Sequence, residues 1–143
     1  MTARFKASTV IDRPVATVFH FYADEHIRNH PRWDPDIELW PASDGPMGVG
    51  TMIRRRNSRS GTSVDGTMEV IEYERDRTFA LVIRDGPVEM RGRTLFEADG
   101  EDRTIITTVV ELPGMDDSMD TGFLTSRLER SGQHIKQLIE SET

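Results

Sequence analysis

The sequence predicts an α+β fold in which a curved antiparallel sheet of about seven strands wraps around one long C-terminal helix. Three observations predict it. The chain opens with one run of strand periodicity, followed by a short helical stretch, and then alternates with a period of two through most of its middle. A stretch of helical periodicity from about Ser118 to Glu142 ends the chain. Because that helix follows the whole sheet, we expect it to pack against the sheet.

Composition limits the class of protein. Hydrophobic residues make up 36% of the 143 residues and charged residues 30%, which is typical of a soluble globular domain, and we expect residues 1–143 to form a single one. No apolar run approaches the roughly 20 residues of a membrane span, and the N-terminus lacks the apolar segment of a secretory signal. We therefore expect a cytoplasmic protein with no membrane span.

Net charge and the absence of cysteine limit the kinds of partner and site that the chain can have. The net charge is −7, with acidic and basic residues interspersed, so the chain lacks the basic face that nucleic acids require. The absence of cysteine excludes disulfides, thiolate catalysis and thiolate metal sites. We expect no nucleic-acid partner and no cofactor, and both a monomer and a homodimer stay open.

The first elements can be placed in order. Phe5 to Asp12 alternates as a half-buried strand, and Pro14 then stands in the first turn of a helix, where its missing N–H is harmless. Asp24 is expected to cap a second short helix that ends at His30-Pro31. Asp36 to Trp40 is a short strand, and the glycine-containing segment Asp44 to Gly50 is a loop.

Hairpin geometry sets the register of the middle strands. A turn centred on Ser60-Gly61 pairs Ile53 with Met68, Arg55 with Gly66 and Asn57 with Val64. A turn near Glu74 to Arg77 then pairs Met68 with Ile83, Val70 with Leu81 and Glu72 with Phe79. A turn at Asp85-Gly86 adds Val88, Met90, Gly92, Thr94 and Phe96 to the same inner face. The last strand, Arg103 to Leu112, permits two registers.

The inner face is mixed in character and predicts a cavity. Gly66, Gly92 and Thr94 are small, and glycine within a strand often marks missing side-chain volume or close approach. The helix stripe that faces the sheet, Leu124, Leu128, Ser131, Ile135 and Leu138, has a gap at Ser131-Gly132. In the alternative interpretation, helix side chains fill these gaps. The expected lining is Tyr22, Trp33, Arg55, Asn57, Met68, Phe79, Met90, Gly92, Thr94, Phe96, Leu128 and Ser131.

Arg54, Arg55 and Arg56 form the most instructive run. Side chains alternate along a strand, so at least one of the three points inward, and the hairpin register selects Arg55. A buried guanidinium needs a partner, which could be Glu72, Glu111 or a ligand group. Replacing Arg55 with Met is then expected to leave stability equal or slightly raised. A strand bulge that leaves all three arginines at the surface is the alternative.

Other motifs are weaker. His26 and His30 have the i, i+4 spacing of a metal-binding pair, but Pro31 follows directly, so we expect no metal and histidines at the surface or pocket rim. The Gly45-Gly48-Gly50 loop lacks a following helix and lysine, which favours a plain strand connection over a phosphate site. Trp33 and Trp40 either close one end of the cavity or pack ordinarily. Arg127 and Asp120 flank the helix stripe where a cavity mouth would open.

This layout resembles the helix-grip fold of the START-like, Bet v 1-like (SRPBCC) superfamily. The phrases Ile11-Asp12-Arg13-Pro14 before Val18-Phe19, then Asp24, then Glu69-Val70-Ile71-Glu72-Tyr73 are similar to the bacterial polyketide cyclase/dehydrase and lipid-transport branch. The resemblance implies a hydrophobic or amphipathic ligand, such as a lipid, polyketide-like or aromatic molecule, between sheet and long helix. The alternative is a cyclase or dehydratase acting on a polyketide-like or aromatic substrate. No catalytic motif is recognisable, so the catalytic residues are unknown.

Overall fold

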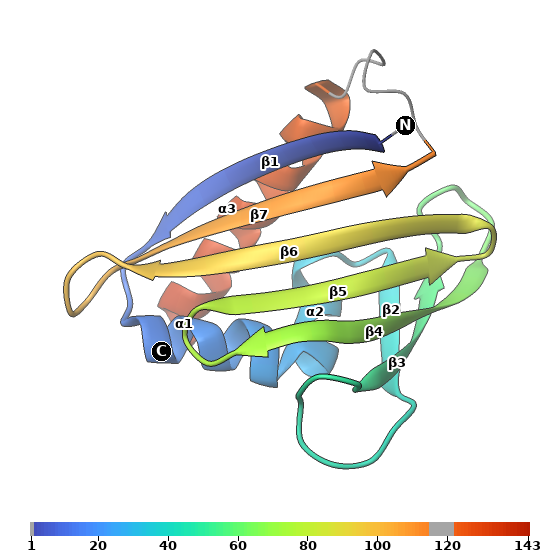
Figure 1. Ribbon diagram of the computed structural model, residues 1–143. Coiled ribbons are helices and arrows are strands. Elements are labelled where there is room, and N and C mark those ends of the chain that lie inside the picture. The colour runs from blue at the N-terminus through green and yellow to red at the C-terminus, as the bar shows by residue number, and fades with distance from the viewer. Residues whose placement is uncertain (1, 115–121) are drawn as a thin grey trace.

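A computed structural model describes residues 2–114 and 122–143 (Figure 1). The strands are β1 (Thr2–Ile11), β2 (Ile37–Pro41), β3 (Met52–Asn57), β4 (Val64–Glu74), β5 (Thr78–Asp85), β6 (Val88–Ala98) and β7 (Thr104–Pro113). The helices are α1 (Val15–Phe19), a π-helical turn (His20–Asp24), α2 (His26–Trp33) and α3 (Gly122–Glu142). The predicted start of the long helix, at Ser118, lies outside the described residues.

The seven strands form one antiparallel sheet, as predicted, and their order is β1-β7-β6-β5-β4-β3-β2. Figure 1 shows the three helices on the same side of the sheet, with α3 running across it and α1 and α2 near its lower edge. The core lies between the sheet and these helices, and its largest fully buried side chains include Phe19, Phe79 and Ile139. No helix among the described residues is long and apolar enough to cross a membrane.

The predicted hairpin registers are largely confirmed. Ile53 pairs with Met68, Arg55 with Gly66 and Asn57 with Val64, although the connection is a loop over residues 58–63 rather than a two-residue turn. The register is unaffected because that loop is centred on the same two residues. The open question of the last strand is settled by the pairing of Gly92 with Val110, which directs Glu111 outward.

One pairing and one turn position were wrong. A β-bulge between Val70 and Glu72 makes Tyr73, not Glu72, the partner of Phe79. The extra residue turns Glu72 to the outer face, where its carboxylate binds Arg93 at 2.8 Å. The next turn lies at Gly86-Pro87, since Asp85 still pairs with Val88 as the last residue of β5. That correction moves Asp85 from a turn into the sheet.

The helix pair also differs from its prediction. Asp24 caps no helix; its carboxylate accepts a hydrogen bond from the Tyr73 hydroxyl at 2.5 Å and contacts His20 Nδ1 at 3.0 Å. Helix α2 continues through Pro31 to Trp33. Proline removes only the one hydrogen bond that its own nitrogen would donate, and burial of the Trp33 side chain offsets that loss.

Candidate functional site

A cavity of about 240 Å³ lies between the concave face of the sheet and α3. Nine residues of the predicted set line it: Tyr22, Trp33, Arg55, Phe79, Met90, Gly92, Thr94, Leu128 and Ser131. The other three lie elsewhere. Met68 and Phe96 are buried in the core, and the Asn57 amide binds Asp85 at 3.0 Å. The lining also includes residues that the sequence did not single out for it, notably Leu81, Ile83, Thr108 and Val110.

The glycines on the inner face have opposite roles. A Cβ placed on Gly92 would meet no atom within 4 Å, so this position contributes open volume. A Cβ on Gly132 would lie 2.2 Å from Thr9 Oγ1, and one on Gly66 would lie 2.0 Å from the Arg84 carbonyl oxygen. The prediction of missing volume at Gly66 and Gly132 was therefore wrong. Those two glycines allow close approach of neighbouring elements.

Arg55 points inward, as the register predicted, and is 4% exposed. Its partner is Asp85, whose two carboxylate oxygens accept hydrogen bonds from Nε at 2.9 and 3.2 Å. The predicted partners are both on the outer face, because the bulge turns Glu72 outward and Glu111 binds Arg4 at 2.9 Å. A fully buried ion pair is therefore part of the cavity wall.

A row of hydroxyls crosses the cavity wall from the helical side to β7. The Tyr22 hydroxyl lies 3.0 Å from Thr94 Oγ1, which lies 3.0 Å from Thr108 Oγ1. Burial raises the pKa of Tyr22, and hydrogen bonding to the two threonines opposes that rise in part. Tyr22 is therefore a neutral donor or acceptor, and the row gives an otherwise apolar wall one polar line.

His26 and His30 line the cavity rather than the outer surface, and His30 lies beside the charged residue Asp34. His26 is 1% exposed, and its Nδ1 lies 2.8 Å from the Tyr22 carbonyl oxygen, while its Nε2 lies 3.0 Å from His30 Nδ1. Burial lowers the pKa of His26 well below its ordinary value, and burial also lowers that of His30, opposed by Asp34 and reinforced by Arg55. Both imidazoles are neutral at neutral pH.

Trp33 packs against both Tyr22 and His30 in this part of the cavity wall. Its ring lies nearly parallel to the ring of Tyr22, with centroids 5.1 Å apart, and to that of His30, with centroids 5.4 Å apart. Trp40 has no such place: it is 40% exposed, with the Arg54 and Arg56 guanidinium groups 6.0 and 5.5 Å from its ring. The two tryptophans that flank one sequence segment thus lie on opposite faces of the sheet.

Charged residues gather where α2, the β3–β4 loop and α3 meet. The Asp34 carboxylate is ion-paired with Arg59, and Arg127 lines the same part of the cavity. Burial alone would raise the pKa of Asp34, but the neighbouring His30 ring and the Arg59 guanidinium lower it to about 2. Asp34, Arg59 and Arg127 together form the rim of the cavity. Asp120, predicted beside Arg127, lies outside the described residues.

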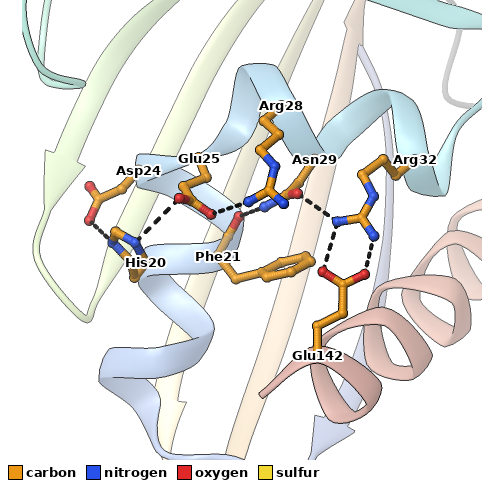
Figure 2. Close-up of polar contacts among 8 residues, drawn as sticks. All are labelled: His20, Phe21, Asp24, Glu25, Arg28, Asn29, Arg32 and Glu142. Atoms are coloured by element: carbon orange, nitrogen blue, oxygen red, sulfur yellow. Dashed lines mark hydrogen bonds and ion pairs between the residues drawn. The ribbon is translucent and has the colours of Figure 1, made fainter.

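A polar network on the outer side of α2 fixes the helix that carries the histidines (Figure 2). Fully buried Asn29 donates to the Phe21 carbonyl oxygen at 2.8 Å and accepts from Arg32 at 3.0 Å. Arg32 also binds both carboxylate oxygens of Glu142, near the end of α3. The turn, α2 and α3 are thereby joined by side-chain contacts that leave the inner face of α2 to the cavity.

Metal and phosphate chemistry have little basis in this arrangement. Within residues 2–114 and 122–143, no group of three or more His, Asp or Glu side chains could hold a metal ion. The glycine loop connects two strands, with Gly45 and Gly50 in the left-handed region and the Gly48 amide donating to Thr51 Oγ1. The site is a largely apolar cavity with a few hydrogen-bonding groups in its wall.

Comparison with known proteins agrees with this architecture. A family model described as polyketide cyclase/dehydrase and lipid transport matches residues 2–140. The crystal structure of Ara h 8.0201 has a TM-score of 0.76 at 16% identity, covering 99% of this chain and 100% of that one. A START superfamily protein from Mycobacterium smegmatis has a TM-score of 0.76 at 15% identity, covering 98% and 99%.

An enzyme is also among the similar structures. Norcoclaurine synthase from Thalictrum flavum, solved in complex with dopamine and hydroxybenzaldehyde, has a TM-score of 0.71 at 15% identity, covering 100% of this chain and 89% of that one. A search of curated proteins finds no significant match. At these identities the solved structures establish a shared helix-grip fold and leave the chemistry to be argued from the site.

Proposed function

Because the chain belongs to the polyketide cyclase/dehydrase and lipid transport family, we propose that it binds a small hydrophobic or amphipathic molecule between the sheet and α3. The observation that carries this proposal is the cavity itself. Its wall divides into a majority of apolar side chains, mainly from β5, β6, β7 and α3, and a smaller set of polar groups that includes Tyr22, His30, Arg55 and Thr94. That division is typical of small-molecule sites, where apolar contact supplies affinity and a few polar groups fix orientation.

The cavity volume limits the size of the ligand. At about 240 Å³ it lies just below the roughly 300–1,000 Å³ of most ligand pockets. A one- or two-ring aromatic molecule, or a short acyl chain, fits this volume better than a whole membrane lipid. The ligand would place its apolar body against Gly92 and Met90 and its polar end towards His30 and Arg55.

A second candidate function is an enzyme that moves protons on such a ligand. The favouring observation is that neutral His30, the Tyr22 hydroxyl and the Arg55 guanidinium all line one cavity. Neutral imidazole is a suitable general base, and a buried guanidinium can stabilise developing negative charge. Native mass spectrometry of freshly purified protein separates the candidates: a ligand recovered unchanged after incubation supports the binder, and a time-dependent mass change supports the enzyme.

The cavity is tested by filling it. Gly92→Leu should abolish binding of the apolar fluorescent probe 2-methoxynaphthalene, because the new side chain would occupy the open space beside Gly92. Overpacking costs about 1–3 kcal/mol, so a melting curve must accompany the binding measurement.

The matched control for this test is Gly48→Leu. Gly48 is also open, with no atom within 4 Å of an added Cβ, but it lies in the loop before β3, outside the cavity lining. A folded Gly92→Leu protein that binds the probe as well as Gly48→Leu does would count against a ligand at this place.

A further inference from the structure

The hydrogen bonds of the two histidines determine where their protons lie. The Tyr22 carbonyl oxygen can only accept, so His26 Nδ1 carries a proton and donates it across 2.8 Å. Neutral His26 then has a lone pair on Nε2, and His30 Nδ1 must donate to it across 3.0 Å. The relay runs from His30 through His26 to the backbone, and it leaves the lone pair of neutral His30 on Nε2.

That remaining nitrogen has no satisfied hydrogen bond among the described residues. Asp34 Oδ2 lies 3.9 Å from it, which is beyond hydrogen-bonding range, and is itself an acceptor. The His30 side chain is 14% exposed and belongs to the cavity lining, and its ring is held nearly parallel to Trp33. An oriented acceptor is therefore presented to the cavity on a rigid helix.

We propose that His30 Nε2 is the cavity's hydrogen-bond acceptor and that it selects a ligand bearing a weakly acidic hydroxyl, of the phenol or enol class. This inference rests on the proposed function and adds to it the chemical group that the ligand must carry. The hydroxyl donates to Nε2, and the aromatic or unsaturated body of the ligand lies beside Trp33 and Phe79.

The surrounding charges keep this acceptor available. On its own helix and the residues that follow, His30 faces His26 and Asp34; from β3 and the following loop it faces Arg55 and Arg59, and Arg127 on α3 lies against the same rim. Arg55 and Arg59 oppose protonation of His30, and Asp34 favours it. Since burial adds to the effect of the arginines, the lone pair persists at neutral pH.

The test compares two probes that differ only in the donor. 2-Naphthol and 2-methoxynaphthalene share a fluorescent ring system, but only the naphthol can donate to His30. Wild-type protein should bind the naphthol about fivefold to tenfold more tightly at pH 7.5, the scale of one hydrogen bond. His30→Phe keeps an aromatic ring but removes the acceptor, so the preference should vanish while binding of the ether persists. His134→Phe, an exposed histidine on the outside of α3, is the control and should keep the preference.

Two measurements on wild-type protein make the test independent of how the variants fold. The preference for naphthol should hold down to about pH 6.5 and decline at lower pH, where protonated His30 can no longer accept. The ¹⁵N resonance of His30 Nε2 should shift when naphthol binds and stay in place with the ether. Equal affinity for the two probes with no resonance shift would overturn the inference and leave the proposed cavity function standing. Failure of both probes to bind, with Gly92→Leu no different from wild type, would overturn the proposed function as well.

Discussion

The outer face of α2 and the turn before it meet solvent through His20, Arg28 and Arg32, which all have carboxylate partners (Figure 2), whereas the inner face carries His26, His30 and Trp33 to the cavity. Histidine occurs on both sides. His20 lies 3.0 Å from the Asp24 carboxylate with a side chain 60% exposed, while the inner pair is buried and neutral. Within one short segment, burial decides whether an imidazole pairs with charge or offers a lone pair.

The two faces of α2 should also differ in how much their side chains contribute to stability. Exposed ion pairs typically contribute about 0–1 kcal/mol each, because solvent already stabilises both charges. Buried polar groups lose that solvent, so removing one partner leaves a large uncompensated cost. We therefore expect substitutions on the cavity side to change stability strongly and substitutions on the solvent side to change it weakly.

The largest effect should follow loss of the buried arginine of the cavity wall. Arg55→Met leaves Asp85, 7% exposed, with its charge buried and only the Asn57 amide as partner. The free energy of unfolding should fall by about 3–5 kcal/mol, measured by urea denaturation. This expected loss of stability replaces the expectation from sequence that Arg55→Met leaves stability equal or slightly raised.

The matched solvent-side variant is Arg56→Met, one residue along the same strand. Arg56 pairs with exposed Asp65 at 2.9 Å, and its loss should change stability far less than the loss of Arg55. The double variant Arg55→Met, Asp85→Leu removes both buried charges and should recover most of the loss. Equal costs for Arg55→Met and Arg56→Met would contradict the comparison.

A smaller effect should appear as a pH dependence of stability. Burial lowers the pKa of both His26 and His30, so between pH 6.5 and 5 the unfolded chain takes up protons that the folded protein does not. Stability is therefore full above pH 6.5 and falls as the pH drops, by up to about 1.4 kcal/mol per pH unit for each group. Denaturant unfolding at several pH values measures the slope.

A variant assigns that slope to the buried histidines. His26→Gln should flatten it. Asp34, whose pKa is lowered to about 2, adds its own loss only at still lower pH, below about 4. A wild-type protein whose stability is flat between pH 6.5 and 5 would show that the inner histidines titrate normally.

The smallest effect is expected for the solvent-side network. Glu142→Gln removes the ion pair to Arg32 at partly exposed atoms and leaves the hydrogen bond from Arg32 to buried Asn29 in place. The melting temperature should drop by only a few degrees, and part of that drop should disappear at high salt. A loss above about 2 kcal/mol would mean that this network supports the fold as strongly as the cavity side does.

Much of the sheet could be predicted from sequence because its rules are local. The period of two and the turn positions determined the pairings of Ile53 with Met68 and of Val70 with Leu81 without any long-range information. The bulge before Glu72 could not be predicted, since a bulge adds one residue to a strand and no residue type marks its position. That single residue removed the expected partner of Arg55.

The site was predictable in outline and less so in its contacts. Strand alternation was enough to place Arg55, Met90, Gly92 and Thr94 on the inner face. It could not separate Gly92, which leaves space, from Gly66 and Gly132, which remove it, because that distinction depends on how closely the neighbouring element approaches. The sequence allowed histidines at the pocket rim but did not predict the hydrogen bond between His26 and His30, although their i, i+4 spacing was its signal.

The π-helical turn at His20–Asp24, closed by a hydrogen bond from the Glu25 amide to the His20 carbonyl oxygen, sets which residues of α2 face the cavity. Each residue of an α-helix advances it by about 100°, and a π-helical turn holds one residue more than an α-helical turn. An α-helical turn through the same residues would therefore leave α2 rotated by about that angle and would carry His26 and His30 away from the cavity wall. The extra residue of one turn is thus what brings two imidazoles to the cavity.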